Sequence, residues 1–464
     1  MKRYEANKPS NLPWVERIPS GWKISKNSQL FRESSELSER GEEPLLSLSQ
    51  YTGISYKSNA VKVGMREADS KVGYRVIHKD DIVMNIMLAW NGSTAVSPFD
   101  GIISPAYAVY RQRTALNPKY FHYLFRIPAI CSYFESNSTG LIKSRLRLYS
   151  DSFMRLFSIV PPHEEQDQIV RYLDWQVSKI NRLIAAKRKQ IALLKEQKQR
   201  RITEVVTHGL NPNVPHKDSG IAWIGAIPAH WHCVALKRCA TVKSGITLGK
   251  QYPVGTKLVS VPYLRVANVQ DGFVNLETVT NLNVTPEEAT QYALPKGCVL
   301  MTEGGDRDKL GRGCVWNGEI EHCIHQNHIF AVTVNDKLLL NKWLEYVSAC
   351  DIGRVYFDIT AIKTTNLACT NASKVMAFPI PLPPCDEQEC IINELNRITY
   401  RFNNVRKSLE KQIEHLQEFR TRLISDVVTG QVDVRGIEIP EYEIIKDTDI
   451  SGDSEDTEGE EYEE

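Results

Sequence analysis

Two stretches of the chain place apolar residues at alternating steps of three and four, with polar residues between them. The first stretch covers residues 164–207 and contains no proline or glycine. A heptad pattern that continues over so many turns predicts a long helix of a coiled coil. Its apolar seam consists of Val170, Leu173, Val177, Ile180, Ile184, Ile191, Leu194 and Val205.

A second heptad stretch lies in the last quarter of the chain. Proline pairs precede both stretches, acidic residues occupy both first turns, and Gly209 and Gly430 follow the two ends, as is typical of helix boundaries. Each helix would be roughly 65 Å long at about 1.5 Å per residue. The simplest partner of each helix is the other one in antiparallel orientation. Two separate surface helices are the alternative, which the narrow seam disfavours. The second seam consists of Ile392, Leu395, Phe402, Leu409, Ile413, Leu416, Leu423 and Val427.

Polar side chains interrupt both seams. They either fix the register of the helices or meet a partner, or they are ordinary solvated edges of the seam. They are Lys187, Lys198 and Arg201 in the first helix and Thr399, Arg406 and Arg420 in the second.

The segments around the two helices also repeat. Trp14, Ile18-Pro19 and Trp22 return as Trp223, Ile227-Pro228 and Trp231, and the sequences at 161–166 and 205–209 return at 383–388 and 427–430. A period this long is too large for a solenoid, and it indicates two copies of a whole domain, each followed by a long helix. We predict domains at 1–162 and 210–382, helices at 163–209 and 383–430, and a C-terminal tail at 431–464.

Both domains have the pattern of a mixed α+β fold. Residues 80–84 and 107–110 predict strands, and residues 118–125 predict a helix; in the second domain, 297–301 and 329–332 predict strands and 341–349 a helix. The order of elements is shared, whereas the residues between them differ. The predicted fold class is therefore α+β, with two repeated mixed domains separated by two long helices packed as an antiparallel coiled coil. An approximate twofold axis across such a pair would invert one domain relative to the other.

The net charge of +1 hides a strong asymmetry along the 464 residues. Residues 441–464 contain twelve Asp or Glu residues and one base, Lys446, so they carry −11 and residues 1–440 carry +12. A basic folded body suits a polyanionic partner, although +12 is only moderate for a body of this size. The tail reads as a solvated, disordered segment. Competition between the tail and DNA for the basic surface is the alternative.

The chain shows no apolar run that would span a bilayer and no secretory segment after Met1. Nine of the ten cysteines follow Gly209, and none forms a CxxC pair. We expect a cytoplasmic protein without membrane association whose cysteines are reduced.

At this point the chain strongly resembles the specificity subunit of type I restriction–modification systems, over roughly residues 10–435. The resemblance rests on the Trp-x3-Ile-Pro-x2-Trp openings, the Pro-Pro-x-x-Glu-Gln helix starts, the tandem layout, and the stretches at 84–90 and 96–105. It implies two target recognition domains, each of which reads half of a bipartite site in double-stranded DNA. It also implies helices that set the spacing and dock two methylation subunits, and restriction subunits that join to cut DNA. The family modifies adenine with S-adenosylmethionine bound by the methylation subunit, so this chain would hold no cofactor, and ATP is expected only on partner subunits.

The motifs of catalysis are missing, which agrees with a non-catalytic subunit. The glycines at 304–313 lack the Lys-Ser/Thr ending of a phosphate loop, and no Asn-Pro-Pro-Tyr-like tetrapeptide occurs. His322, Cys323, His325 and His328 have no metal-site spacing, because alternation on a strand would send them to opposite faces. A stand-alone DNA methyltransferase or nuclease, and a coiled-coil adaptor without DNA binding, are the rival interpretations.

Candidate DNA contacts are basic and amide side chains in segments that the two domains do not share. Arg and Lys bind guanine edges and Asn and Gln bind adenine edges, although most contacts in such interfaces go to phosphates. Each candidate is equally well explained as a solvated surface residue. In the first domain they are Asn91, Lys143, Arg145 and Arg147, and in the second Arg307, Lys309, Arg312, Gln326, Asn327, Lys363 and Thr364.

Overall fold

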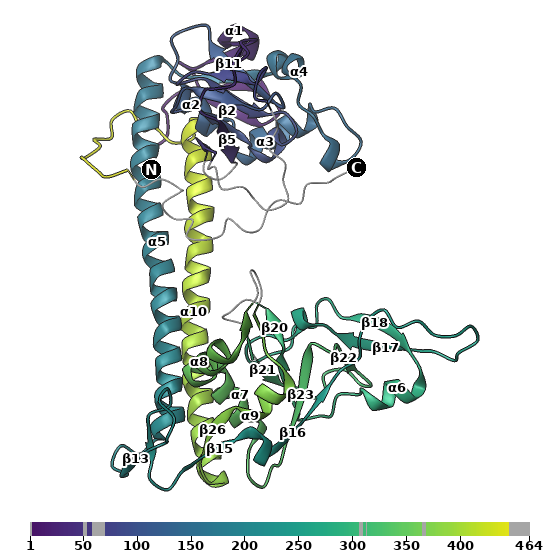
Figure 1. The fold of residues 1–464 in the computed structure, drawn as a ribbon. Helices are drawn as coiled ribbons and strands as arrows, with labels where there is room; N and C mark the ends of the chain where they lie inside the picture. The colour runs from purple at the N-terminus through teal and green to yellow at the C-terminus, as the bar shows by residue number, and fades with distance from the viewer. Residues whose placement is uncertain are drawn as a thin grey trace. The chain divides into compact units, whose positions relative to one another are not determined.

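The computed structural model describes residues 2–49, 53–57, 70–305, 310–311, 313–363 and 368–444 (Figure 1). The chain forms two compact units, one of Met1–Lys189 with Leu409–Glu464 and the other of Gln190–Ser408. Each unit contains one mixed α/β domain together with part of both long helices. The predicted boundaries instead assign each long helix to a segment of its own, and they stay a prediction.

The two long helices are α5 (His163–His208) and α10 (Cys385–Val428), as the heptad pattern predicts. In the first unit, Arg420 donates a hydrogen bond to Asn181 (2.9 Å) and Lys187 donates one to Gln412 (2.6 Å). Because the higher number on α5 pairs with the lower number on α10, the helices are antiparallel there. They pack against each other, so the alternative of two separate surface helices is wrong.

The seams of the long helices are buried where each helix lies on a domain. In the first unit Leu173, Ile180, Ile184 and Leu423 are all less than 5% exposed. The two polar pairs just described sit along the same contact, which supports a register role for Lys187 and Arg420. In the second unit the buried seam residues Val205, Ile392 and Leu395 belong to the domain core, as does the neighbouring Ile202.

The first domain is built on a four-stranded antiparallel sheet. Tyr107 pairs with Asn85 and Tyr110 pairs with Ile82, so both strands predicted at 80–84 and 107–110 are confirmed in this sheet. Ile82, Val83 and Met84 are fully buried, which explains why their apolar run is so clear in the sequence. The strand order is β4 (Phe31–Glu33), β11 (Tyr107–Gln112), β8 (Ile82–Asn85), β9 (Thr94–Val96).

The second domain repeats this sheet with the same order and sense. Val299 pairs with Val332 and Thr302 with Ile329, in the strands predicted at 297–301 and 329–332. The order is β16 (Ala240–Ser244), β23 (Ile329–Val334), β19 (Val299–Thr302), β21 (Gly313–Val315).

Two further strand pairs occur in both domains. One pair leads directly into the long helix, and the other includes the Ile-Pro dipeptide of the repeated motif. In the first domain they are β3 (Lys23–Lys26) with β12 (Phe157–Val160) and β1 (Asn7–Leu12) with β2 (Val15–Pro19); in the second they are β15 (His232–Ala235) with β26 (Pro379–Leu382) and β13 (His216–Asp218) with β14 (Ala226–Pro228).

The remaining strands differ between the domains. Among the described residues, the first domain has two-stranded pairs here, whereas the second has two three-stranded sheets. The pairs are β5 (Leu46–Ser49) with β6 (Gly53–Tyr56) and β7 (Arg75–Ile77) with β10 (Gly101–Ile103); the sheets are β18 (Thr280–Val284), β17 (Val259–Leu264), β22 (Ile324–His325) and β20 (Gly304–Gly305), β25 (Ala368–Cys369), β24 (Ile362–Lys363).

Short helices complete each domain. The predicted helices at 118–125 and 341–349 are confirmed as α2 and α7, and Asn117 caps α2 by accepting a hydrogen bond from the Lys119 amide. The others were not predicted. The first domain contains α1 (Asn27–Leu30), α2 (Pro118–Leu124), α3 (Pro128–Ser136) and α4 (Ser150–Arg155), and the second contains α6 (Pro286–Gln291), α7 (Asn341–Ala349), α8 (Asp351–Thr360) and α9 (Ala372–Ala377).

Aromatic side chains fill both domain cores. In the first, Phe31 packs edge-on against Phe121 with ring centroids 5.1 Å apart. In the second, the ring centroids of Phe357 and Phe378 lie 5.2 Å apart. All ten cysteines are free, and five of them are buried. None of the helices within the described ranges is long and apolar enough to cross a membrane.

Candidate nucleic-acid interface

A buried glutamine joins each long helix to its domain, and its contacts are the same in both units. Gln166, in the first turn of α5, accepts a hydrogen bond from the Asn117 amide (2.9 Å) and donates one to the Pro161 carbonyl (2.8 Å). Gln388, in the first turn of α10, accepts from the Leu340 amide (2.9 Å) and donates to the Pro383 carbonyl (2.9 Å). The repeated Pro-Pro-x-x-Glu-Gln motif is therefore a structural joint that orients the helix on the domain.

The second tryptophan of each repeated opening lies at the end of the other long helix. Trp22 and Trp231 are 1% and 0% exposed. A side-chain carbon on Gly430, after α10, would contact Trp22, and one on Gly209, after α5, would contact Trp231. Each domain is thus held between the start of one helix and the end of the other. This explains why the motif at 14–22 returns together with the helix ends.

The predicted DNA contacts of the first domain lie partly together. Asn91 ends the short 3-10 helix η1 (Ala89–Asn91), and Gly92 follows it with a φ of 77°, as expected for an Asn-Gly turn. Lys143 begins η2 (Lys143–Arg145), and its ammonium lies 5.4 Å from the ring centroid of Trp90. The structure therefore brings Lys143 beside the residue that precedes Asn91, although the two candidates are far apart in sequence.

The three basic candidates of the 143–147 segment differ in their surroundings. The Lys143 ammonium lies 3.3 Å from the Glu135 carboxylate, and the Lys143 side chain is 69% exposed, so this ion pair contributes little to stability. Arg145 is exposed, whereas Arg147 is half-buried and donates to the Leu146 carbonyl (3.0 Å). Lys143 and Arg145 are thus the cations best placed to meet a phosphate.

In the second domain, Gln326 and Asn327 have structural roles that the sequence does not show. The Gln326 side chain accepts a hydrogen bond from the Val266 backbone amide (3.3 Å). The Gln326 backbone amide donates one to the Leu264 carbonyl (2.9 Å). The Asn327 amide donates to the Ile246 carbonyl (3.0 Å). Both residues are half-buried. Gln326 therefore tethers β22 to the turn after β17.

Of the remaining candidates, the structure describes Lys363. Lys363 in β24 and Gly305 in β20 both pair with Ala368, from opposite sides. Lys363 has a described backbone only, and the other four candidates, Arg307, Lys309, Arg312 and Thr364, lie outside the described residues.

The geometry gives no support to a metal site at His322, Cys323, His325 and His328 either. Within the described ranges, no group of three or more His, Cys, Asp or Glu side chains is placed to hold a metal. His325 is 2% exposed, and burial lowers its pKa to about 4, so it is neutral at pH 7. His328 instead contacts the Glu303 carboxylate.

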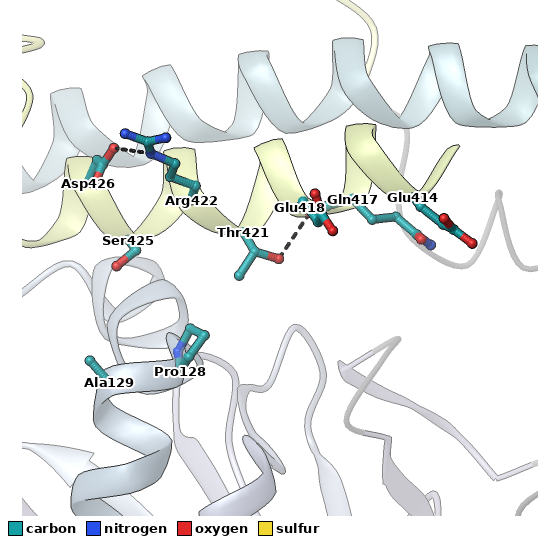
Figure 2. Close-up of a pocket in the computed structure, with 9 residues that line it drawn as sticks. All are labelled: Pro128, Ala129, Glu414, Gln417, Glu418, Thr421, Arg422, Ser425 and Asp426. Atoms are coloured by element: carbon teal, nitrogen blue, oxygen red, sulfur yellow. Dashed lines mark hydrogen bonds and ion pairs between the residues drawn. The ribbon is translucent and has the colours of Figure 1, made fainter. Parts of the chain in front are cut away.

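A groove of about 710 Å³ lies between α3 and the last turns of α10 in the first unit (Figure 2). Pro128 and Ala129 form one wall, and the polar face of α10 forms the other. Arg422 is paired with Asp426 at 3.6 Å. The polar lining consists mainly of the carboxylates Glu414, Glu418 and Asp426 and the hydroxyls of Thr421 and Ser425.

Comparisons with known proteins place this arrangement among restriction–modification proteins. No family model matches the sequence. The chain is 23% identical over 211 residues to a protein described as the type I restriction enzyme MjaX specificity subunit of Methanocaldococcus jannaschii, a match that covers 45% of this chain and 48% of that protein. It is 19% identical over 210 residues to the type I restriction enzyme EcoKI specificity subunit of Escherichia coli, covering 45% and 44%. The match thus spans slightly under half the length of each curated relative.

The fold match covers much more of the chain. A chain solved in work on complex assembly and conformational transition of the type I R-M system superposes with a TM-score of 0.64. The superposition covers 89% of this chain and 99% of that one, at 16% identity. This chain has the fold of a type I specificity subunit. The resemblance inferred from the motifs is confirmed.

Proposed function

We propose that this chain is the sequence-reading subunit of a type I restriction–modification complex. Each domain reads one half of a bipartite site in double-stranded DNA. The observation that carries the proposal is the contrast within the chain, where the four-stranded sheets and helix joints repeat and the loops and edge strands do not. Two readers of different sequences need this combination, since the frame must hold both in equivalent settings.

The described side chains support a two-part binding mode. Exposed cations such as Lys143 and Arg145 attract phosphates, which gives affinity that falls as salt rises. Amide side chains such as Asn91 and Asn327 have the donor and acceptor pair that matches an adenine edge. Phosphate contacts then position each domain, and base contacts select the sequence.

The long helices have two proposed roles, which are the spacing of the two domains and the binding of partner subunits. We infer that they hold the two domains on DNA about one helical turn apart, near ~10 bp. We infer also that they dock two methylation subunits, so that one adenine on each strand is modified. S-adenosylmethionine and ATP would be bound by the methylation and restriction subunits, and this chain contributes no catalytic residue.

Methylation mapping tests the proposal directly. Genomic DNA of the host is mapped with the chain present, deleted and restored from a plasmid. A bipartite methylated motif that disappears on deletion and returns on restoration is expected. If the set of methylated motifs is the same in all three strains, the proposal is wrong.

Two purified-protein measurements separate the rival functions. Binding of the full chain to a mixed-sequence duplex is expected to weaken steeply between 50 and 200 mM salt, as for proteins with many phosphate contacts. A coiled-coil adaptor without a DNA role would show no such binding. Methyl transfer or DNA cleavage by the chain without partner subunits would favour the stand-alone enzyme.

Lengthening the helices tests their spacing role. One heptad inserted in both α5 and α10 adds about 10 Å at ~1.5 Å per residue. The unread spacer of the methylated motif is expected to lengthen, or methylation to be lost. An unchanged spacer with full methylation would contradict the spacing role.

A further inference from the structure

The segment between α3 and α4 forms a closed loop, the 139–147 loop. The Thr139 amide donates to the Arg147 carbonyl (2.8 Å) and the Arg147 amide donates back (2.9 Å). Inside the loop, Gly140 has a φ of 149°, and a Cβ there would lie 2.6 Å from the Arg145 carbonyl oxygen. Glycine is therefore required for this closure. The loop is a built structure with a defined tip.

The tip of the 139–147 loop carries two exposed aliphatic side chains. Leu141 is 102% exposed and Ile142 is 55% exposed. The side chain of Leu141 is thus as open to water as in an extended peptide, although it sits in an ordered loop. A folded domain gains no stability from such a position, because burial of apolar surface is what stabilises the fold. A ligand that covers the tip would supply the missing burial.

Cations surround this apolar tip. Lys143 follows the pair directly, and its ammonium lies over the Trp90 ring, while Arg145 is exposed on the same short helix. Glu135 near Lys143 is the carboxylate that balances part of this charge. An apolar point framed by cations is complementary to DNA, in which apolar base stacks lie between two rows of phosphates.

We propose that Leu141 and Ile142 insert into a base-pair step of the half-site read by the first domain. This inference rests on the proposed function. Leucine and isoleucine wedges of this kind partly unstack DNA and kink it in many binding proteins. Lys143 and Arg145 hold the flanking phosphates, and the double hydrogen bond between Thr139 and Arg147 keeps the wedge rigid. The wedge makes sequence selection depend on how easily that step unstacks.

The test uses the full chain with its methylation subunits and a duplex of the mapped motif. 2-Aminopurine replaces one adenine at a time across the first half-site, because its fluorescence rises when it unstacks. Binding is expected to raise the fluorescence several-fold at one step. The double variant Leu141→Ala/Ile142→Ala is expected to lose this rise and about tenfold in specific affinity, with non-specific affinity unchanged.

Matched variants isolate the wedge from charge and folding. Leu37→Ala removes another exposed leucine, 52% exposed, from the same domain and is expected to keep both the signal and the affinity. Leu141→Gln keeps the length of the side chain without its apolar character and is expected to behave like the alanine variant. Arg145→Gln is expected to lower the salt slope by about one while the fluorescence rise persists.

Three outcomes would overturn the inference. The fluorescence rise persists in the double variant, or no step of the half-site shows a rise, or the variant loses binding of the methylation subunit while DNA affinity stays unchanged. The last result would make the tip a protein contact. Failure of the proposed function is seen separately, as the absence of a mapped motif and of salt-dependent binding by the wild-type chain.

Discussion

The two domains are alike where they join the long helices and differ in their remaining strands. Near the helices, Gln166 and Gln388 make matching bonds and Trp22 and Trp231 occupy matching positions. At the sheet edges the first domain has two-stranded pairs where the second has three-stranded sheets. The joints to the long helices are thus the same in both domains, whereas the remaining strands differ. Matched substitutions at equivalent positions of the two domains test how far this equivalence extends.

The helix-ending glycines are expected to give the largest effect. A Cβ at Gly430 would lie 2.3 Å from Cδ of Pro19, whereas one at Gly209 would lie 3.2 Å from the nearest Trp231 atom. Both residues have positive φ. Gly430→Ala is expected to destabilise the first unit by about 4 kcal/mol, and Gly209→Ala the second by about 1–2 kcal/mol. Unfolding monitored by hydrogen exchange in each unit measures the two values; equal losses would contradict the asymmetry.

A buried histidine gives the second domain an acid sensitivity at a position where the first domain has Ile103. His325 and Ile103 precede the starts of β23 and β11 by the same interval. Burial lowers the His325 pKa from 6.5 to about 4, so the unfolded chain binds the extra proton first. Stability contributed by neutral His325 is therefore complete above pH 6.5 and falls by about 3 kcal/mol as the pH drops to 4.

The variant His325→Ile imitates the first domain at this position. It is expected to flatten the pH dependence of the second unit between pH 6.5 and 4 in thermal unfolding. An unchanged pH profile would show that His325 is not the group responsible.

The glutamine joints are expected to give a somewhat smaller loss. Gln388 makes one more bond than Gln166, because its amide also donates to the Leu338 carbonyl (2.9 Å). Gln388→Leu is expected to cost about 3 kcal/mol and Gln166→Leu about 2 kcal/mol, since buried backbone groups lose their partners. Gln417→Leu, on the groove wall in Figure 2, is the control and is expected to change stability by less than ~0.5 kcal/mol. A larger loss for Gln166 would contradict the bond count.

The two matching tryptophans differ in a single hydrogen bond. The Trp231 indole donates to Glu387 (3.0 Å), whereas the buried Trp22 indole nitrogen has no partner among the described residues. Trp231→Phe and Trp22→Phe lose similar packing, so Trp231→Phe is expected to cost about 1.5 kcal/mol more. Chemical denaturation compares them. Equal costs would indicate that the Glu387 bond contributes nothing.

The sequence predicted the frame because its signals are local. The heptad seams, the Asn117-Pro118 helix start and the buried run at 82–84 each indicate an element without knowledge of the rest. The short edge strands, such as β22 with only two residues, depend on pairing partners far along the chain and have no such signal.

The candidate interface was less predictable for the same reason. The meeting of Lys143 with Trp90 depends on how distant segments fold together. The tether from Gln326 to Val266 is equally invisible to sequence. Leu141 was missed because an exposed leucine has no mark in a single sequence. The roles of the predicted contacts in DNA binding stay a prediction.

The central hypothesis is that the repeated sheets and helix joints hold two domains, each of which recognises its own DNA sequence. An exchange of residues 10–160 for those of a relative with a different mapped motif tests it most directly, with methylation mapping of the host DNA as the readout. We expect one half of the bipartite motif to change to that of the relative, while the other half and the spacer stay the same. A change in both halves would contradict it.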